Sequence, residues 1–356
     1  MTRIAASTPN GAGAEIVSPL IEATRLTFDA NVTACLMLSE SDLAAVSFGD
    51  GSVALIDTDT GSCLRTLELH SVACTGLVPC GAGFLSYGQD GRVVLIADPA
   101  APEPDVIWES DGDWVEALVF NEGSETVALA VRNQVTVIDL TGEETWSCEL
   151  NGCITGLCPD SLGKRIAASH YGGVSVLSVD TGNIEMALEW KGSHIGVTWS
   201  PDDRFIVTAT QEKELHIWDL VTMDDYRIGG YPRKIHQMAW SADGKTLACS
   251  GTDAITAWPF VGTGPAGRMP VEIGFAFGAT VSAVAAHPDE TLVAGGFTSG
   301  NLLIGATGKG EALVAGARTG KPVTSLSWSE DGQCLVAGDA GGLVSVLKLP
   351  ADLGIK

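Results

Sequence analysis

The sequence predicts an all-β fold, a single closed β-propeller of four-stranded antiparallel blades, with eight blades expected and seven as the alternative. Three observations support this prediction. A pattern of four short strands recurs every 39–46 residues, which is the period of propeller blades. The segments alternate between apolar and polar residues with period 2, as strands do and helices do not. Turns rich in Gly, Asp, Ser and Pro separate them, and the chain contains 43 Gly. The repeats begin at Thr33, Cys74, Val115, Ile154, His194, Ile235, Val281 and Val323.

The fifth repeat, HIGVTWSPDDRFIVTATQEKELHIWDL and the residues after it, shows the expected strand order. We name the four strands of a repeat a to d in chain order. Strand a is expected at His194–Trp199 and strand b at Phe205–Thr210, joined by a Ser-Pro-Asp-Asp turn. Strand c follows at Leu215–Leu220 and strand d near Tyr226–Ile228. The other repeats have equivalent segments, including predicted d strands at Thr66–Leu69, Val106–Glu109, Thr145–Glu149, Met186–Glu189, Val271–Ile273 and Ala312–Val314.

The two ends of the repeat region are predicted to meet in one sheet. The eighth repeat ends with strand c, and Glu22–Phe28 aligns with the d strands of the other repeats. Pairing this segment beside the last strand c would remove an exposed sheet edge. We therefore expect a flexible tail at residues 1–18, a propeller over 19–350 and a C-terminal tail at 351–356. The seventh repeat has the weakest support, because Gly262–Pro270 lengthens the gap before it.

These repeats resemble the WD40 repeat family. The resemblance rests on Ile217-Trp218-Asp219-Leu220, on the Ser-x-Asp-Gly turns that begin at Ser241 and Ser329, and on strand-a segments such as Val323–Trp328. It extends from about Glu22 to Leu349 and implies a propeller that binds other proteins. The sequence departs from the family pattern in two ways. Only Trp218 and Trp258 occupy the Trp position of strand c, and most repeats lack the His that the family has before strand a. Blade stability is therefore expected to depend mainly on apolar packing between sheets.

Charge and composition exclude several classes of partner and location. The net charge of −24 disfavours nonspecific binding to nucleic acid and to anionic membranes. No apolar run is long enough for a transmembrane helix, and the N-terminal residues lack the apolar core of a signal peptide. The nine Cys form no regular framework, which is typical of reduced thiols in the cytoplasm. We expect an acidic cytoplasmic protein with no nucleic-acid or membrane partner.

The sequence contains no motif that predicts catalysis, and we expect a protein that is not an enzyme and needs no cofactor. Gly316–Lys321 resembles a phosphate-binding loop, but it is one residue short and is followed by Pro322. For a metal, the only candidates are Cys153, His170 and His194, which adjacent antiparallel strands would bring to one edge. A thiol and imidazoles with ordinary packing roles are the favoured interpretation of these three residues.

Large and basic side chains in the loops from strand d to a and from strand b to c predict a protein-binding surface. These loops meet on one face of a propeller, around its central channel, and we call their edge the rim. Aromatic residues and Arg are enriched where proteins contact one another, whereas turns usually consist of small polar residues. Side chains that plug the channel are the alternative explanation. The candidates are Trp114, Arg132, His170, Tyr171, His194, Tyr231, Arg233, Lys234 and Phe297.

The function favoured by these observations is a non-catalytic scaffold or adaptor that binds a protein partner through the rim. One alternative is a propeller that binds a small molecule or a metal in its channel and has enzymatic activity. Such a site needs converging charged side chains, and the strand-a starts offer only Thr, Cys, Val, Ile and one His. A second alternative is a non-catalytic subunit of a larger complex.

Overall fold

The computed structural model describes residues 21–39, 41–316, 318–350 and 353, and these form an all-β propeller with four-stranded antiparallel blades. The expected tail at residues 1–18 lies outside the described residues, as does most of the tail at 351–356. A search of the described residues for helices long and apolar enough to cross a membrane finds none.

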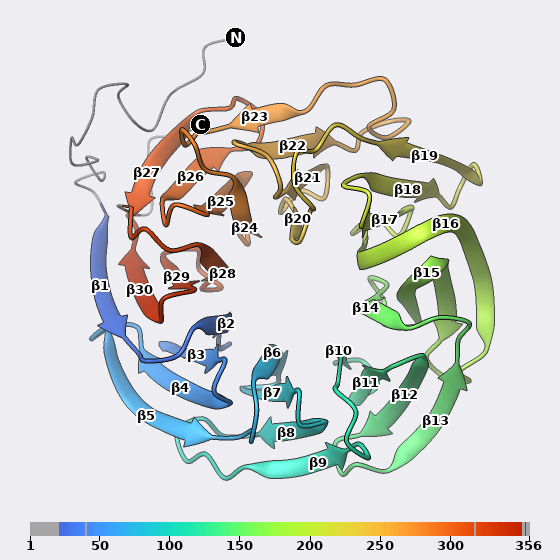
Figure 1. Ribbon diagram of the computed structural model, residues 1–356, viewed down its shortest axis with the longest axis horizontal. Helices are drawn as coiled ribbons and strands as arrows, with labels where there is room; N and C mark the ends of the chain where they lie inside the picture. The colour runs from blue at the N-terminus through green and yellow to red at the C-terminus, as the bar shows by residue number, and fades with distance from the viewer. Residues whose placement is uncertain (1–20, 40, 317, 351–352, 354–356) are drawn as a thin grey trace. The chain divides into compact units, whose positions relative to one another are not determined.

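Contacts divide the chain into two compact units. Unit 1 comprises residues 1–48, 54–66 and 235–356, and unit 2 comprises residues 49–53 and 67–234. Figure 1 labels the strands of both units in chain order.

Unit 1 contains most of the first repeat and the sixth, seventh and eighth repeats. The sheet of the first repeat consists of β2 (Val32–Met37), β3 (Leu43–Phe48), β4 (Ser52–Asp57) and β5 (Ser62–Glu68). The sixth-repeat sheet consists of β20 (Met238–Trp240), β21 (Thr246–Cys249), β22 (Ile255–Pro259) and β23 (Val271–Ile273). The seventh-repeat sheet consists of β24 (Val281–Ala286), β25 (Leu292–Phe297), β26 (Leu302–Ala306) and β27 (Ala312–Gly316). The last sheet consists of β28 (Val323–Trp328), β29 (Cys334–Asp339), β30 (Leu343–Lys348) and β1 (Glu22–Thr27).

Unit 2 contains the second to fifth repeats. The second-repeat sheet consists of β6 (Cys74–Cys80), β7 (Gly83–Gly88), β8 (Arg92–Ile96) and β9 (Asp105–Glu109). The third-repeat sheet consists of β10 (Ala117–Asn121), β11 (Thr126–Val131), β12 (Gln134–Asp139) and β13 (Glu144–Glu149). A six-stranded sheet consists of β14 (Ile154–Pro159), β15 (Arg165–Ser178), β16 (Ile184–Trp199), β17 (Phe205–Thr210), β18 (Leu215–Asp219) and β19 (Asp224–Ile228).

The number of sheets corrects the expectation of eight. The described strands form seven hydrogen-bonded sheets, which matches the alternative of seven blades, so the prediction of eight blades is wrong. The eight repeats give seven sheets because the fourth and fifth repeats share the six-stranded sheet. β15 carries strands b and c of the fourth repeat, and β16 carries its strand d and then strand a of the fifth. The ladder continues across the junction because Tyr171 pairs with Ser193.

The predicted pairing of the N-terminal strand with the last repeat is confirmed. β1 runs antiparallel to β30, with Glu22 opposite Lys348 and Thr27 opposite Leu343. The N–H of Phe28 then donates to the carbonyl of Gly342 at 2.9 Å. Segments from the two ends of the described chain thus form one sheet, and β30 has no open edge.

Burial falls from strand b to strand d within a repeat, and this explains the composition of the strands. Strands b such as β25 and β29 are buried at every position, because neighbouring sheets of unit 1 cover both of their faces. They consist of Val, Ile, Leu, Phe and small residues. Strands d such as β1 and β5 are mostly exposed and polar. The apolar core therefore lies between sheets, as the sequence predicts.

The second repeat contains a buried polar network in addition to its apolar packing. The Nδ1 atom of His70 lies 2.9 Å from the carboxylate of Asp90, and its Nε2 atom lies 3.0 Å from the hydroxyl of Ser86. His70 is 5% exposed and Ser86 is fully buried, so each polar group is satisfied inside the protein. This network connects the loop before β6 to the turn between β7 and β8.

Candidate functional site

The rim of unit 2 carries exposed aromatic side chains beside a basic residue. Trp114, just before β10, is 51% exposed, and Tyr171, in the turn between strands b and c of the fourth repeat, is 61% exposed. The backbone connects the strand ends: the N–H of Ile154 donates to the carbonyl of Arg132, and the N–H of Glu116 donates to the carbonyl of Ala130. In the third and fourth repeats the start of strand a therefore lies beside the end of a strand b, as the propeller prediction requires.

Arg132 is held in an unusual backbone conformation at this edge. Its φ of 53° is in the left-handed region, which side chains other than Asn and Asp rarely adopt. Its Nε atom lies 2.9 Å from Oδ1 of Asp113, and the Arg132 side chain is 71% exposed. An ion pair this exposed contributes little to stability. The guanidinium is therefore accessible to a carboxylate of a partner.

His170 supports the turn that exposes Tyr171. Its Nδ1 atom lies 2.9 Å from the carbonyl oxygen of Tyr171, and its Nε2 atom lies 3.0 Å from the hydroxyl of Ser175. Both ring nitrogens are thus engaged at the two sides of the turn. Arg233 is exposed and Lys234 is half-buried in the loop before the sixth repeat.

Three of the expected rim contacts are buried and cannot form an exposed surface. Phe297 is fully buried at the end of β25, because the turn to β26 is made by the residues after it. Tyr231 is 7% exposed. His194 is fully buried, with Nδ1 2.7 Å from Thr208 Oγ1 and Nε2 3.0 Å from the carbonyl oxygen of Trp190. Packing inside the protein covers all three side chains, in contrast to the exposure expected from the sequence.

The three residues considered as metal ligands differ in their exposure to solvent. Cys153 is exposed, whereas His194 is buried with both nitrogens in hydrogen bonds. Burial lowers the pKa of His194 and keeps the ring neutral. Among the described residues, no group of three or more His, Cys, Asp and Glu side chains is arranged to hold a metal ion.

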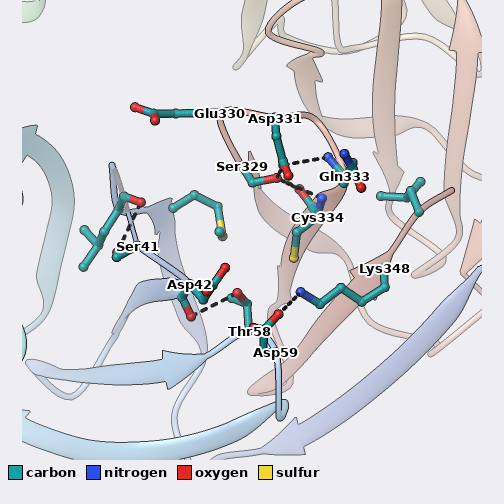
Figure 2. Close-up of a pocket in the computed structure, with 13 residues that line it drawn as sticks. Ser41, Asp42, Thr58, Asp59, Ser329, Glu330, Asp331, Gln333, Cys334 and Lys348 are labelled. Carbon is teal, nitrogen blue, oxygen red and sulfur yellow. Dashed lines mark hydrogen bonds and ion pairs between the residues drawn. The ribbon is translucent and has the colours of Figure 1, made fainter. Parts of the chain in front are cut away.

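A cavity that the sequence did not predict lies in unit 1, on the edge formed by the turns between strands a and b and between strands c and d. Its volume is about 530 Å³, and Figure 2 shows its polar lining. The first and last sheets supply its residues, and the carboxylates outnumber the single lysine. The lining residues are Met37, Leu38, Ser41, Asp42, Thr58, Asp59, Ser329, Glu330, Asp331, Gln333, Cys334, Lys348 and Leu349.

Hydrogen bonds hold the turns that form this cavity. Lys348 Nζ donates to Asp59 Oδ1 at 2.7 Å, and Thr58 donates both its N–H and its hydroxyl to the carbonyl of Asp42 (Figure 2). Asp331 accepts the Ser329 hydroxyl at 2.6 Å, which holds the pKa of its carboxyl below the usual value. Burial raises the pKa of the Cys334 thiol, so it is a poor nucleophile. The cavity is polar and acidic, without a nucleophile activated for catalysis among these groups.

Further exposed apolar side chains lie outside the predicted rim. Phe277 is 80% exposed in the loop between β23 and β24 of unit 1. Val221 and Met223 are 72% and 64% exposed in the turn between β18 and β19 of unit 2. The pattern Gly274-Phe-Ala-Phe-Gly278 was a usable signal for the first of these sites. A Thr-Met pair where other repeats have Thr-Gly was a usable signal for the second.

The fold and the sequence repeats together define the protein as a β-propeller built from repeated four-stranded units. The family model described as WD domain, G-beta repeat, matches residues 188–219 and 314–346. These two matches and the propeller fold are consistent with a divergent WD40 repeat family, as the motifs suggested.

Comparison with whole proteins supports the fold and does not indicate a function. No curated protein matches the chain. Among solved structures, the crystal structure of the computationally designed Ika8 protein is similar, with a TM-score of 0.76 and 18% identity. The alignment covers 91% of this chain and 98% of the designed one. At this identity the similarity concerns the fold alone.

Proposed function

We propose that the protein is a non-catalytic scaffold that binds a protein partner through the rim of unit 2. WD40 propellers generally act as platforms for protein interaction, and the repeats of this chain are consistent with that family. The observation that carries the proposal is the exposure of Trp114 and Tyr171 on a rim that also carries the exposed side chain of Arg132. Exposed aromatic residues cost solubility unless a partner covers them.

Electrostatics favour a partner that presents carboxylates to this rim. The chain as a whole has a net charge of −24, so the general field repels acidic proteins. Arg132, Arg233 and Lys234 provide local positive charge on the rim. Arg also forms two parallel hydrogen bonds with a carboxylate, which gives the contact geometric specificity. An acidic segment with apolar residues for Trp114 and Tyr171 would fit both features.

The experiment is affinity capture from the native cell, with the wild-type chain and single variants as baits, followed by mass spectrometry. Trp114→Ala and Tyr171→Ala should each weaken binding of the recurrent partner at least tenfold, since truncation of an interface aromatic costs about 2 kcal/mol or more. Leu162→Ala is the matched control, because Leu162 is 69% exposed in a turn between strands a and b. Arg233→Ala is compared in the same way with Arg65→Ala on an exposed strand d.

The result that contradicts the proposal is a partner retained by both rim variants as well as by wild type. Melting temperatures of all variants are measured alongside. A rim variant that unfolds would show that its side chain stabilises the fold, and binding would then be compared with the conservative variants Trp114→Phe and Tyr171→Phe.

A further inference from the structure

A small pocket in unit 2 lies far along the strands from the rim, at the turn between β18 and β19. Its volume is about 180 Å³. One wall comes from β16 and the other from the turn and its flanking strands. Trp218, which is 5% exposed, is the aromatic residue of the lining, and four of the lining residues are Asp or Glu. The lining residues are Ala187, Leu188, Glu189, Trp218, Asp219, Leu220, Met223, Asp224 and Asp225.

Met223 adopts a backbone conformation that this turn normally assigns to glycine. Its φ is 60°, in the left-handed region, and its N–H donates to the carbonyl of Asp219 at 2.8 Å. The equivalent residues of three other repeats are Gly61, Gly142 and Gly182, with φ of 64°, 90° and 69°. A side chain at such a position is strained, and strained residues concentrate at functional sites. Met223 lines the pocket and is 64% exposed.

A buried histidine lies behind the pocket and contacts one of its lining residues. His216 is fully buried and stacks on Trp190, with ring centroids 4.1 Å apart, while Trp218 packs against it at 4.3 Å. Within the described part of the chain, neither ring nitrogen has a hydrogen-bond partner. Its Nε2 atom lies 3.3 Å from Oδ1 of Asp225 on the pocket wall. The buried ring therefore lies against a carboxylate that lines the pocket.

The carboxylates of the pocket are only partly compensated. Arg204 pairs with Asp219 at 2.6 Å, and Arg227 pairs with Glu214 at 3.5 Å. His216 supplies no positive charge at neutral pH, because burial lowers its pKa to about 3. Glu189, Asp224 and Asp225 therefore keep the pocket negative beside an aromatic wall.

We propose that this pocket binds the guanidinium of an arginine presented by a protein segment, at a site separate from the rim. A planar guanidinium can donate to carboxylates and stack on an indole at the same time. The exposed side chains of Val221 and Met223 would contact apolar residues next to that arginine, and Met adapts well to varied partners. The exposed, strained Met223 and the acidic lining of the pocket are then explained by one ligand.

The test measures fluorescence polarisation of a labelled, N-acetylated peptide, Ala-Leu-Arg-Leu-Ala, with the full chain at low ionic strength. We expect saturable binding that weakens at least tenfold in Asp224→Asn/Asp225→Asn. The matched control is Asp289→Asn/Glu290→Gln, which removes two exposed charges elsewhere and should change binding less than twofold. A peptide with Gln in place of Arg should not bind.

Two further variants separate this site from the rim and from folding. Met223→Gly should weaken binding at least threefold while raising the urea midpoint of unfolding, a combination that a purely structural residue would not show. Trp114→Ala should bind the peptide normally, so failure of the rim proposal and failure of this one are distinguishable. The proposal is overturned if the wild-type chain does not bind the peptide, if the Gln peptide binds equally, or if the two double variants bind alike.

Discussion

Lowering the pH from 7 to 5 should destabilise the protein through His216. This side chain is fully buried between Trp190 and Trp218, and burial lowers its pKa from 6.5 to about 3. In the unfolded chain the imidazole titrates near its ordinary pKa of about 6.5. Between the two values the unfolded state binds a proton that the folded state excludes. The stabilisation is therefore complete above pH 6.5 and is lost as the pH falls toward 3.

The size of the effect follows from proton linkage. Each pH unit inside this window changes the free energy of unfolding by about 1.4 kcal/mol for one group. Because protonation of the unfolded chain begins near pH 6.5, the loss attributable to His216 between pH 7 and pH 5 is about 2 kcal/mol. The pKa of His194 is also lowered by burial, so it adds a loss of the same sign. Most carboxyl groups remain ionised at pH 5, which keeps their contribution small.

The assay is urea unfolding followed by tryptophan fluorescence at pH 7 and pH 5. His216→Phe keeps an aromatic ring against Trp190 but cannot titrate, so its loss between the two pH values should be about 2 kcal/mol smaller than that of the wild-type chain. His236→Gln is the matched control, because His236 is exposed, and its loss should equal that of the wild-type chain. An identical pH dependence in His216→Phe and the wild-type chain would refute the reasoning.

Three other perturbations test the fold. Gly51→Ala should lower the free energy of unfolding by on the order of 2 kcal/mol or more, because the added Cβ would lie 2.2 Å from a backbone oxygen at a φ of 94°. Gly81→Ala is the control: its φ is 56° and the space around it is open, so the loss should be about 1 kcal/mol. Urea midpoints of unfolding give the comparison. Arg204→Met should cost about 2 kcal/mol in the same assay, since Asp219 is 4% exposed and would lose its ion pair. Deleting residues 1–28 removes β1 and exposes the edge of β30, so light scattering should show aggregation, and a deletion that stops before β1 should not cause it.

Local sequence determined the strands and turns of this protein. Strand β6 begins at Cys74, β14 at Ile154, β24 at Val281 and β28 at Val323, as the repeat pattern predicts. Period-2 alternation and turn residues act over a few neighbours, so they can be recognised without knowing what packs on a strand. The pairing of β1 with β30 was also predictable, because a missing strand d at one end matched a spare segment at the other.

Burial and the number of sheets were decided by tertiary structure. The loops of the rim looked alike in sequence, yet Phe297 is fully buried and Tyr171 is 61% exposed. The difference depends on which side chains of neighbouring sheets reach each loop. The junction in β16 likewise depends on Tyr171 pairing with Ser193, a contact that joins two repeats into one ladder. Both acidic pockets have walls from different strands, so no single stretch of sequence contains them. Strands and turns follow from local preferences, whereas exposure and pockets follow from packing between segments distant in the chain.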